Sequence, residues 1–134
     1  MNKIIVASGP VIIEDGKTLL NISGKDNFWK FCGGRVEENE TLQQTATREV
    51  KEEMGLEIEI INPTPFLLHT AKETAEGDID VILVHYLAKR IGEIFPGEDI
   101  REWKWIPISE LAELEKNGEL APNIIPTLKH FHII

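Results

Sequence analysis

Residues 41–55 read TLQQTATREVKEEMG and predict an amphipathic helix. Both ends carry signals, because Thr41 and Gln44 have the spacing of a capping box and Gly55 suits the left-handed position after the last turn. At about 100° per residue, one apolar stripe would pack on a core; it consists of Leu42, Ala46, Val50 and Met54. The opposite side is expected to face solvent; it holds Gln44, Thr47, Arg48 and Lys51.

Three glutamates of this helix lie where an ordinary amphipathic helix keeps apolar side chains. Glu49 and Glu53 project within roughly 20° of Leu42, and Glu52 flanks them at the edge of the stripe. Their spacing makes them neighbours that repel one another, and a partly buried group of carboxylates is costly unless a cation compensates it. The alternative is a solvated run of charges with an Arg48–Glu52 pair, which is common on helix surfaces. The angular position of the acids favours a bound divalent cation.

The chain on either side of this helix predicts strands that alternate irregularly with two further helices. Strands are expected at about 3–13, 18–23, 57–61, 65–70, 79–88 and 102–106. The 79–88 segment is apolar enough to be central in a sheet. A second helix is expected to start with Ser109 as its cap and to stop at Asn117-Gly118, and a third is expected at about 123–131. The pattern predicts an α/β (α+β) fold, with a mixed sheet sandwiched between helices.

Length, charge and cysteine content limit the classes of protein to which this chain can belong. The chain has 134 residues and a net charge of −9, so we expect one domain over residues 1–134. Such an acidic surface repels nucleic acid and anionic membranes, and no apolar run approaches the ~20 residues that span a bilayer. Small phosphorylated substrates remain compatible if some acids hold divalent cations. The single cysteine, Cys32, excludes an intramolecular disulfide and a cysteine-based metal site. A cytoplasmic protein is expected.

The residues around the helix match a longer pattern. From position 34 the chain fits G-x5-E-x7-R-E-U-x-E-E-x-G-U, where U is aliphatic, at nine positions: Gly34, Glu40, Arg48, Glu49, Val50, Glu52, Glu53, Gly55 and Leu56. This segment resembles the Nudix box, and the W-x-F-x-G-G approach and the W-I-P-I-S-E-L segment at 105–111 are similar to patterns of MutT-like Nudix hydrolases. Two departures are Cys32 in place of proline and Asn39 in place of glycine. Asparagine tolerates a left-handed backbone, so the turn before the helix is expected to survive.

The resemblance implies roles for individual residues. Glu49, Glu52 and Glu53 would bind Mg²⁺, for which Mn²⁺ can substitute, and the Gly33 carbonyl would be an additional ligand. Arg48 and Glu40 would orient these acids. Nudix enzymes often use a further acid from a loop before the late W-x-P strand, and Asp99, with its neighbour Glu98, falls at that position. Glu49 is the first candidate for the general base, and Asp99 is the alternative.

The signals for substrate recognition are weaker. The aromatic residues Phe28, Trp29 and Phe31 either stack on a base or simply pack in the core. Asn123 resembles a base-reading asparagine of MutT-type triphosphatases, and capping of the last helix explains it equally well. His85, in an apolar strand, is expected to be a core residue.

The resemblance therefore implies Mg²⁺-dependent hydrolysis of a diphosphate linkage in a nucleoside diphosphate derivative. A MutT-like nucleoside triphosphate pyrophosphohydrolase is the leading interpretation. Ser23 and the Gly-Asp-Ile-Asp at 77–80 supply no arginine for an oxidised guanine, which makes that substrate doubtful. The alternatives are hydrolysis of a nucleotide sugar or a related derivative, and a catalytically silent module that binds nucleotides or a protein. The expected partner is a small nucleotide, and a homodimer is possible because small family members often pair.

Overall fold

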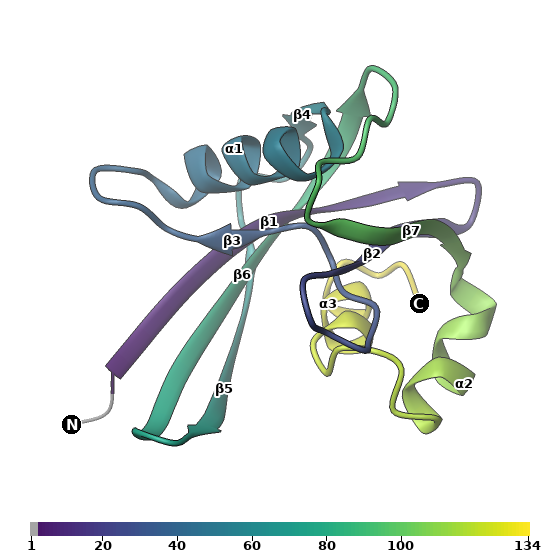
Figure 1. Ribbon diagram of the computed structural model, residues 1–134. Coiled ribbons are helices and arrows are strands. Elements are labelled where there is room, and N and C mark those ends of the chain that lie inside the picture. The colour runs from purple at the N-terminus through teal and green to yellow at the C-terminus, as the bar shows by residue number, and fades with distance from the viewer. Residues whose placement is uncertain (1–2) are drawn as a thin grey trace.

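The structure is a computed structural model that describes residues 3–134 (Figure 1). Its strands are β1 (Lys3–Glu14), β2 (Lys17–Ser23), β3 (Gly34–Arg35), β4 (Glu57–Ile60), β5 (Phe66–Thr74), β6 (Gly77–Ile91) and β7 (Ile100–Pro107). Its helices are α1 (Leu42–Met54), α2 (Leu111–Lys116) and α3 (Ile124–His130), and a 3₁₀ turn, η1 (Ile108–Glu110), leads into α2.

The sheet is mixed, and its centre is a parallel pair. Strands β1 and β6 run parallel from Lys3 opposite Ile79 to Ile12 opposite Ala88. The other pairings are antiparallel: β2 joins β1 and carries β7 on its far side, while β4 and β5 follow one another along the outer edge of β6. The central place expected for the 79–88 segment is therefore confirmed.

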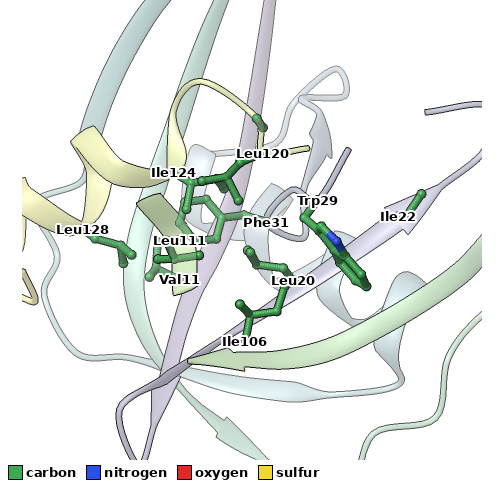
Figure 2. Packing of buried hydrophobic residues seen from close by; sticks show 11 residues of the cluster. Val11, Leu20, Ile22, Trp29, Phe31, Ile106, Leu111, Leu120, Ile124 and Leu128 are labelled. Atoms are coloured by element: carbon green, nitrogen blue, oxygen red, sulfur yellow. The ribbon is translucent and has the colours of Figure 1, made fainter. Parts of the chain in front are cut away.

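Helices cover both faces of the sheet, as predicted. Helix α1 lies over one face, and α2 and α3 lie over the other (Figure 1). Successive residues of β1 point to opposite faces, so that Ile12 packs with Val50 and Met54 of α1. Its neighbour Val11 packs on the other side with Leu111 and residues of α3 (Figure 2). Among residues 3–134, no helix is long and apolar enough to cross a membrane.

The ends of α1 agree with the local sequence signals. Thr41 accepts a hydrogen bond from the Gln44 N–H at 3.1 Å, and the Gln44 side chain accepts one from the Thr41 N–H at 2.8 Å, which completes the capping box. Gly55 has a φ of 67° and ends the helix. Asn39 also has a φ of 67°, so it does adopt the left-handed backbone that glycine would favour.

Three sequence-based details are wrong or incomplete. Ser109 does not cap the second helix: it lies inside η1, and neither η1 nor α2 has a side-chain cap. Strands β5 and β6 extend beyond their predicted ends because they form a long hairpin whose pairing reaches Thr74 opposite Gly77. The two-residue strand β3 was not predicted, since its pairing with β1 is a long-range contact with no local periodicity.

Candidate active site

A cavity of about 330 Å³ opens beside the C-terminal half of α1. It is lined by three chain segments besides the helix, which are the end of β2, the 30–33 segment and the loop before β7. Its lining residues are Ser23, Lys30, Gly33, Glu49, Glu52, Glu53, Gly97, Glu98, Asp99 and Ile100. All three helix glutamates predicted as metal ligands therefore share one cavity with Gly33 and both predicted loop acids.

The glycine pair at 33–34 lets the chain pass close to α1. A Cβ atom on Gly34 would lie within 2.5 Å of Glu49 Oε2, well inside ordinary van der Waals contact. The Gly33 N–H donates a hydrogen bond of 2.8 Å to Glu53 Oε1. The two glycines thus make room for Glu49 and fix one oxygen of Glu53.

The three helix glutamates differ in exposure. The Glu49 side chain is 15% exposed, whereas that of Glu52 is 58% exposed. Burial raises the pKa of the Glu53 carboxyl to about 7; the charges of Glu49 and Asp99 add to this rise, and the Gly33 N–H opposes it. The position of Glu49 and Glu53 on the inner side of α1 agrees with the helical projection, with Glu52 at the solvent edge.

Arg48 connects three acids around the site, which are Glu40, Glu49 and Glu52. Its Nε donates to Glu40 Oε2 at 2.6 Å and its Nη2 donates to Glu40 Oε1 at 3.0 Å. Its Nη1 donates to Glu49 Oε1 at 2.8 Å and lies 3.4 Å from Glu52. Nη2 also donates to the Arg35 carbonyl at 3.0 Å. The expectation that Arg48 faces solvent is therefore wrong, because its guanidinium forms charge-assisted hydrogen bonds with the carboxylates beside the site.

Hydrogen bonds fix the Glu40 carboxylate beside the Arg48 guanidinium. Besides the two bonds from Arg48, it accepts hydrogen bonds from the Glu37 N–H at 2.9 Å and the Thr45 hydroxyl at 2.8 Å. The Arg48 guanidinium lowers the pKa of Glu40 to about 2, with help from the Glu37 N–H. This geometry suits the orienting role that the resemblance implies for both residues.

The loop before β7 is attached to the end of α1 by its backbone. The Phe95 N–H donates to the Met54 carbonyl at 2.7 Å, and the Gly97 N–H donates to the Glu53 carbonyl at 2.8 Å. A Cβ on Gly97 would lie 2.6 Å from the Glu52 carbonyl oxygen, so this approach requires glycine. These bonds satisfy helix carbonyls that have no partner inside the helix, and they place Asp99 at the cavity.

The donor set of this cavity suits a hard divalent cation. Carboxylate and backbone carbonyl oxygens are the ligands that Mg²⁺ prefers, and no sulfur or imidazole lines the cavity among the described residues. Within residues 3–134, no three acidic, histidine or cysteine side chains converge on a single point. Mg²⁺ does not need such a cage, since it keeps several waters and is commonly held by one or two carboxylates together with substrate phosphates. The residues present therefore fit Mg²⁺.

The residues considered for base recognition lie elsewhere. Trp29 and Phe31 are buried in the core cluster beneath α2 and α3 (Figure 2). Phe28 packs against the same cluster. Asn123 is 5% exposed and precedes α3 without a side-chain capping bond. The aromatic residues therefore pack in the core, which was one of the two interpretations. The side chain of Asn123 makes no capping hydrogen bond, so capping does not explain this residue. His85 is buried, as predicted, 4.9 Å from the Phe31 ring.

Sequence reasoning missed four cavity residues, which are Ser23, Lys30, Gly97 and Ile100. A signal for Lys30 was present. It lies between Trp29 and Phe31, and alternate residues of an extended segment point to opposite faces. Burial of both aromatic neighbours therefore directs Lys30 to the cavity side. Ser23 had no comparable signal, because it ends a strand whose neighbours are buried on both faces.

An acidic helix, a glycine-bounded loop and a second acidic loop surround one cavity whose oxygen donors suit a divalent cation. Comparison with known proteins agrees. The family model of the NUDIX domain matches residues 5–128, so the chain belongs to the NUDIX family. The predicted resemblance to MutT-like Nudix hydrolases is thereby confirmed.

Individual relatives point the same way. The chain is 39% identical over 59 residues to the CTP pyrophosphohydrolase of Escherichia coli K12, an alignment that covers 41% of this chain and 44% of that protein. It is 27% identical over 122 residues to the nucleoside triphosphatase NudI of an Escherichia coli strain, with 81% and 85% covered. A NUDIX hydrolase structure from Nitrosomonas europaea superposes with a TM-score of 0.76 at 20% identity, over 97% of this chain and 89% of that one, which confirms the fold.

Proposed function

We propose that this protein is a Mg²⁺-dependent hydrolase of a phosphoanhydride bond in a nucleoside triphosphate. The observation that carries the proposal is the single cavity that holds Glu49, Glu52 and Glu53 together with Asp99. The names of two relatives, a CTP pyrophosphohydrolase and a nucleoside triphosphatase, favour a triphosphate over other diphosphate derivatives.

The carboxylates of α1 would hold the cation, with Mn²⁺ as a substitute and with Gly33 as a possible carbonyl ligand. When bound, Mg²⁺ neutralises charge on phosphate oxygens and lowers the pKa of a coordinated water. Arg48 would keep Glu49 and Glu52 oriented toward the cavity, and Glu40 would anchor Arg48 from behind. The hydrogen bond from the Gly33 N–H would keep Glu53 Oε1 in place and leave the other oxygen of Glu53 to bind the cation.

Glu49 and Asp99 are the two candidates for the general base. Glu49 is the more buried and is oriented by Arg48 Nη1 at 2.8 Å, whereas Asp99 is exposed and its loop is tied to the protein through the backbone. A base must lie at a fixed distance from the attacking water, so the better-held Glu49 is favoured. Glu49→Gln should lower kcat far more than Asp99→Asn. The assignment fails if Glu49→Gln keeps a near-normal kcat with intact metal binding.

A panel of nucleoside triphosphates, nucleoside diphosphates and nucleotide sugars tests the function itself. Each would be incubated with and without Mg²⁺, and the products would be separated to identify the bond that is cut. The proposal expects Mg²⁺-dependent conversion of a triphosphate, absent in Glu53→Gln. Preferential cleavage of a nucleotide sugar would replace the substrate class, and no turnover of any compound would identify a silent binding module.

A further inference from the structure

Lys30 stands out in the charge pattern of the cavity. Five acids line it, and among the described lining residues Lys30 is the one basic side chain. Arg48 is not a lining residue, and its three donor nitrogens are already engaged by Glu40, Glu49 and the Arg35 carbonyl. Among the described lining residues, Lys30 is therefore the one cationic group that a phosphate chain in the cavity would meet.

The backbone holds Lys30 firmly in this place. Lys30 and Asn21 exchange two backbone hydrogen bonds of 2.9 Å, and this pairing continues the edge of β2. Its neighbours Trp29 and Phe31 are 8% and 4% exposed on the opposite side. A shift of Lys30 away from the cavity would have to pull an aromatic side chain out of the core, so its direction is fixed.

The present partner of Lys30 is easily exchanged. Lys30 Nζ lies 2.8 Å from Asp26 Oδ2, and the two side chains are 30% and 38% exposed. Exposed ion pairs of this kind contribute little to stability. Asp26 lies outside the cavity lining, whereas Lys30 lines the cavity together with the glutamates of α1. Its flexible stem lets Nζ swing from Asp26 to an anion in the cavity.

We infer that Lys30 is a substrate-binding residue. Its ammonium group would part from Asp26 and contact a phosphate oxygen in the cavity that the carboxylates of α1 also line. The inference rests on the proposed function, because it assigns a role within the same site. Ammonium groups bind phosphate as point charges, and a charge-assisted hydrogen bond of this type is stronger than a neutral one. Asp26 would act as a competitor that holds Lys30 while the cavity contains no phosphate.

Two substitutions that delete the same ion pair separate this role from a structural one. If the Lys30–Asp26 pair merely stabilised the fold, Lys30→Gln and Asp26→Asn would act alike. If Lys30 binds phosphate, Lys30→Gln should raise KM about tenfold or more with a smaller change in kcat, whereas Asp26→Asn should lower KM or leave it unchanged. Lys30→Arg should restore part of the affinity, because it keeps the charge.

Lys51→Gln is the matched control. Lys51 lies on α1 but outside the cavity lining and pairs with Glu57, so its replacement removes one positive charge without touching the site. It should leave KM within about twofold of the wild-type value, since an exposed charge outside the cavity is screened by solvent and salt. The inference is overturned if Lys51→Gln and Lys30→Gln raise KM equally, if Asp26→Asn raises KM as Lys30→Gln does, or if Lys30→Gln leaves KM unchanged.

A binding measurement keeps the test separate from the proposed function. Titration calorimetry with inorganic pyrophosphate and Mg²⁺ should show about tenfold weaker binding to Lys30→Gln than to the wild type, and unchanged binding to Lys51→Gln. This result would support the inference even if no nucleotide of the panel were hydrolysed. Turnover by the wild type with identical KM and pyrophosphate affinity in Lys30→Gln would overturn the inference and leave the proposed function standing. A wild type that neither hydrolyses nucleotides nor binds pyrophosphate would overturn both.

Discussion

Replacement of Gly34 by alanine moves the Glu49 carboxylate without changing its chemistry. The new Cβ would lie within 2.5 Å of Glu49 Oε2, whereas ordinary contacts begin near 3.4 Å, so the carboxylate has to retreat by about 1 Å. Gly34 has no left-handed backbone, so alanine itself introduces no backbone strain there. A displacement of about 1 Å at a reacting group commonly costs about 100-fold in rate. We expect kcat to fall by about that factor.

Steady-state kinetics on the best substrate of the nucleotide panel would measure the effect. The Gly34→Ala/Glu49→Ala double variant is the control, because the methyl group has nothing to displace once the carboxylate is gone. Its kcat should equal that of Glu49→Ala alone, which is the non-additive behaviour of two residues acting through one group. Thermal unfolding should show that both single variants remain folded. A Gly34→Ala enzyme with more than about half of the wild-type kcat would refute the reasoning.

Three further predictions concern stability and the metal site. Thr41→Ala removes the hydroxyl that accepts the Gln44 N–H, and the free energy of unfolding should fall by about 1 kcal/mol in urea titrations. Burial lowers the pKa of His85 to about 4, so between about pH 6.5 and pH 4 the unfolded chain binds a proton at this residue and the folded protein does not. The free energy of unfolding should therefore decrease as the pH falls from about 6.5 toward 4, by up to about 3 kcal/mol, and His85→Phe should lose this slope. Arg48→Lys cannot reproduce the forked contacts to Glu40 and Glu49, so the Mg²⁺ concentration for half-maximal activity should rise about tenfold.

Each of these predictions has an outcome that contradicts it. Equal urea midpoints for the wild type and Thr41→Ala would mean that the capping box is weak in solution. Parallel pH–stability curves for the wild type and His85→Phe would mean that His85 titrates normally in the folded protein. An unchanged Mg²⁺ requirement in Arg48→Lys would mean that charge alone, and not the planar fork of the guanidinium, orients the acids.

The features predicted correctly from sequence are those set by neighbours in the chain. The bounds of α1 follow from the Thr41 capping box and from Gly55, and both act within a few residues. The inward position of Glu49 and Glu53 follows from helix periodicity alone. Ser109 shows the limit of such reasoning, because the chain enters α2 through a 3₁₀ turn whose Ile108 packs against the core, and that serine lies within the turn.

The parts of the site that the sequence did not reveal depend on contacts between distant segments. Helix periodicity placed Arg48 on the solvated side, yet its long side chain reaches Glu40, which lies before α1, and Glu49, its neighbour on the helix. Lys30 reaches the cavity through pairing with Asn21, nine residues earlier in the chain. Counting back from Trp105 did locate Asp99, but the bonds that bring its loop to α1 have no counterpart in local sequence.

The last turn of α1 organises the whole site. Glu53 of this turn accepts a hydrogen bond from the Gly33 N–H. The carbonyls of Met54 and Glu53, which have no partner inside the helix, accept hydrogen bonds from the N–H groups of Phe95 and Gly97. A helix terminus always leaves such carbonyls without partners inside the helix, so the loop before β7 docks where these carbonyls need donors. The acids of the helix and of the loop are then positioned by one structural unit. A distortion of this turn, for example by a substitution at Gly97 that meets the Glu52 carbonyl, should displace both sets of acids together and weaken metal binding more than loss of Asp99 alone.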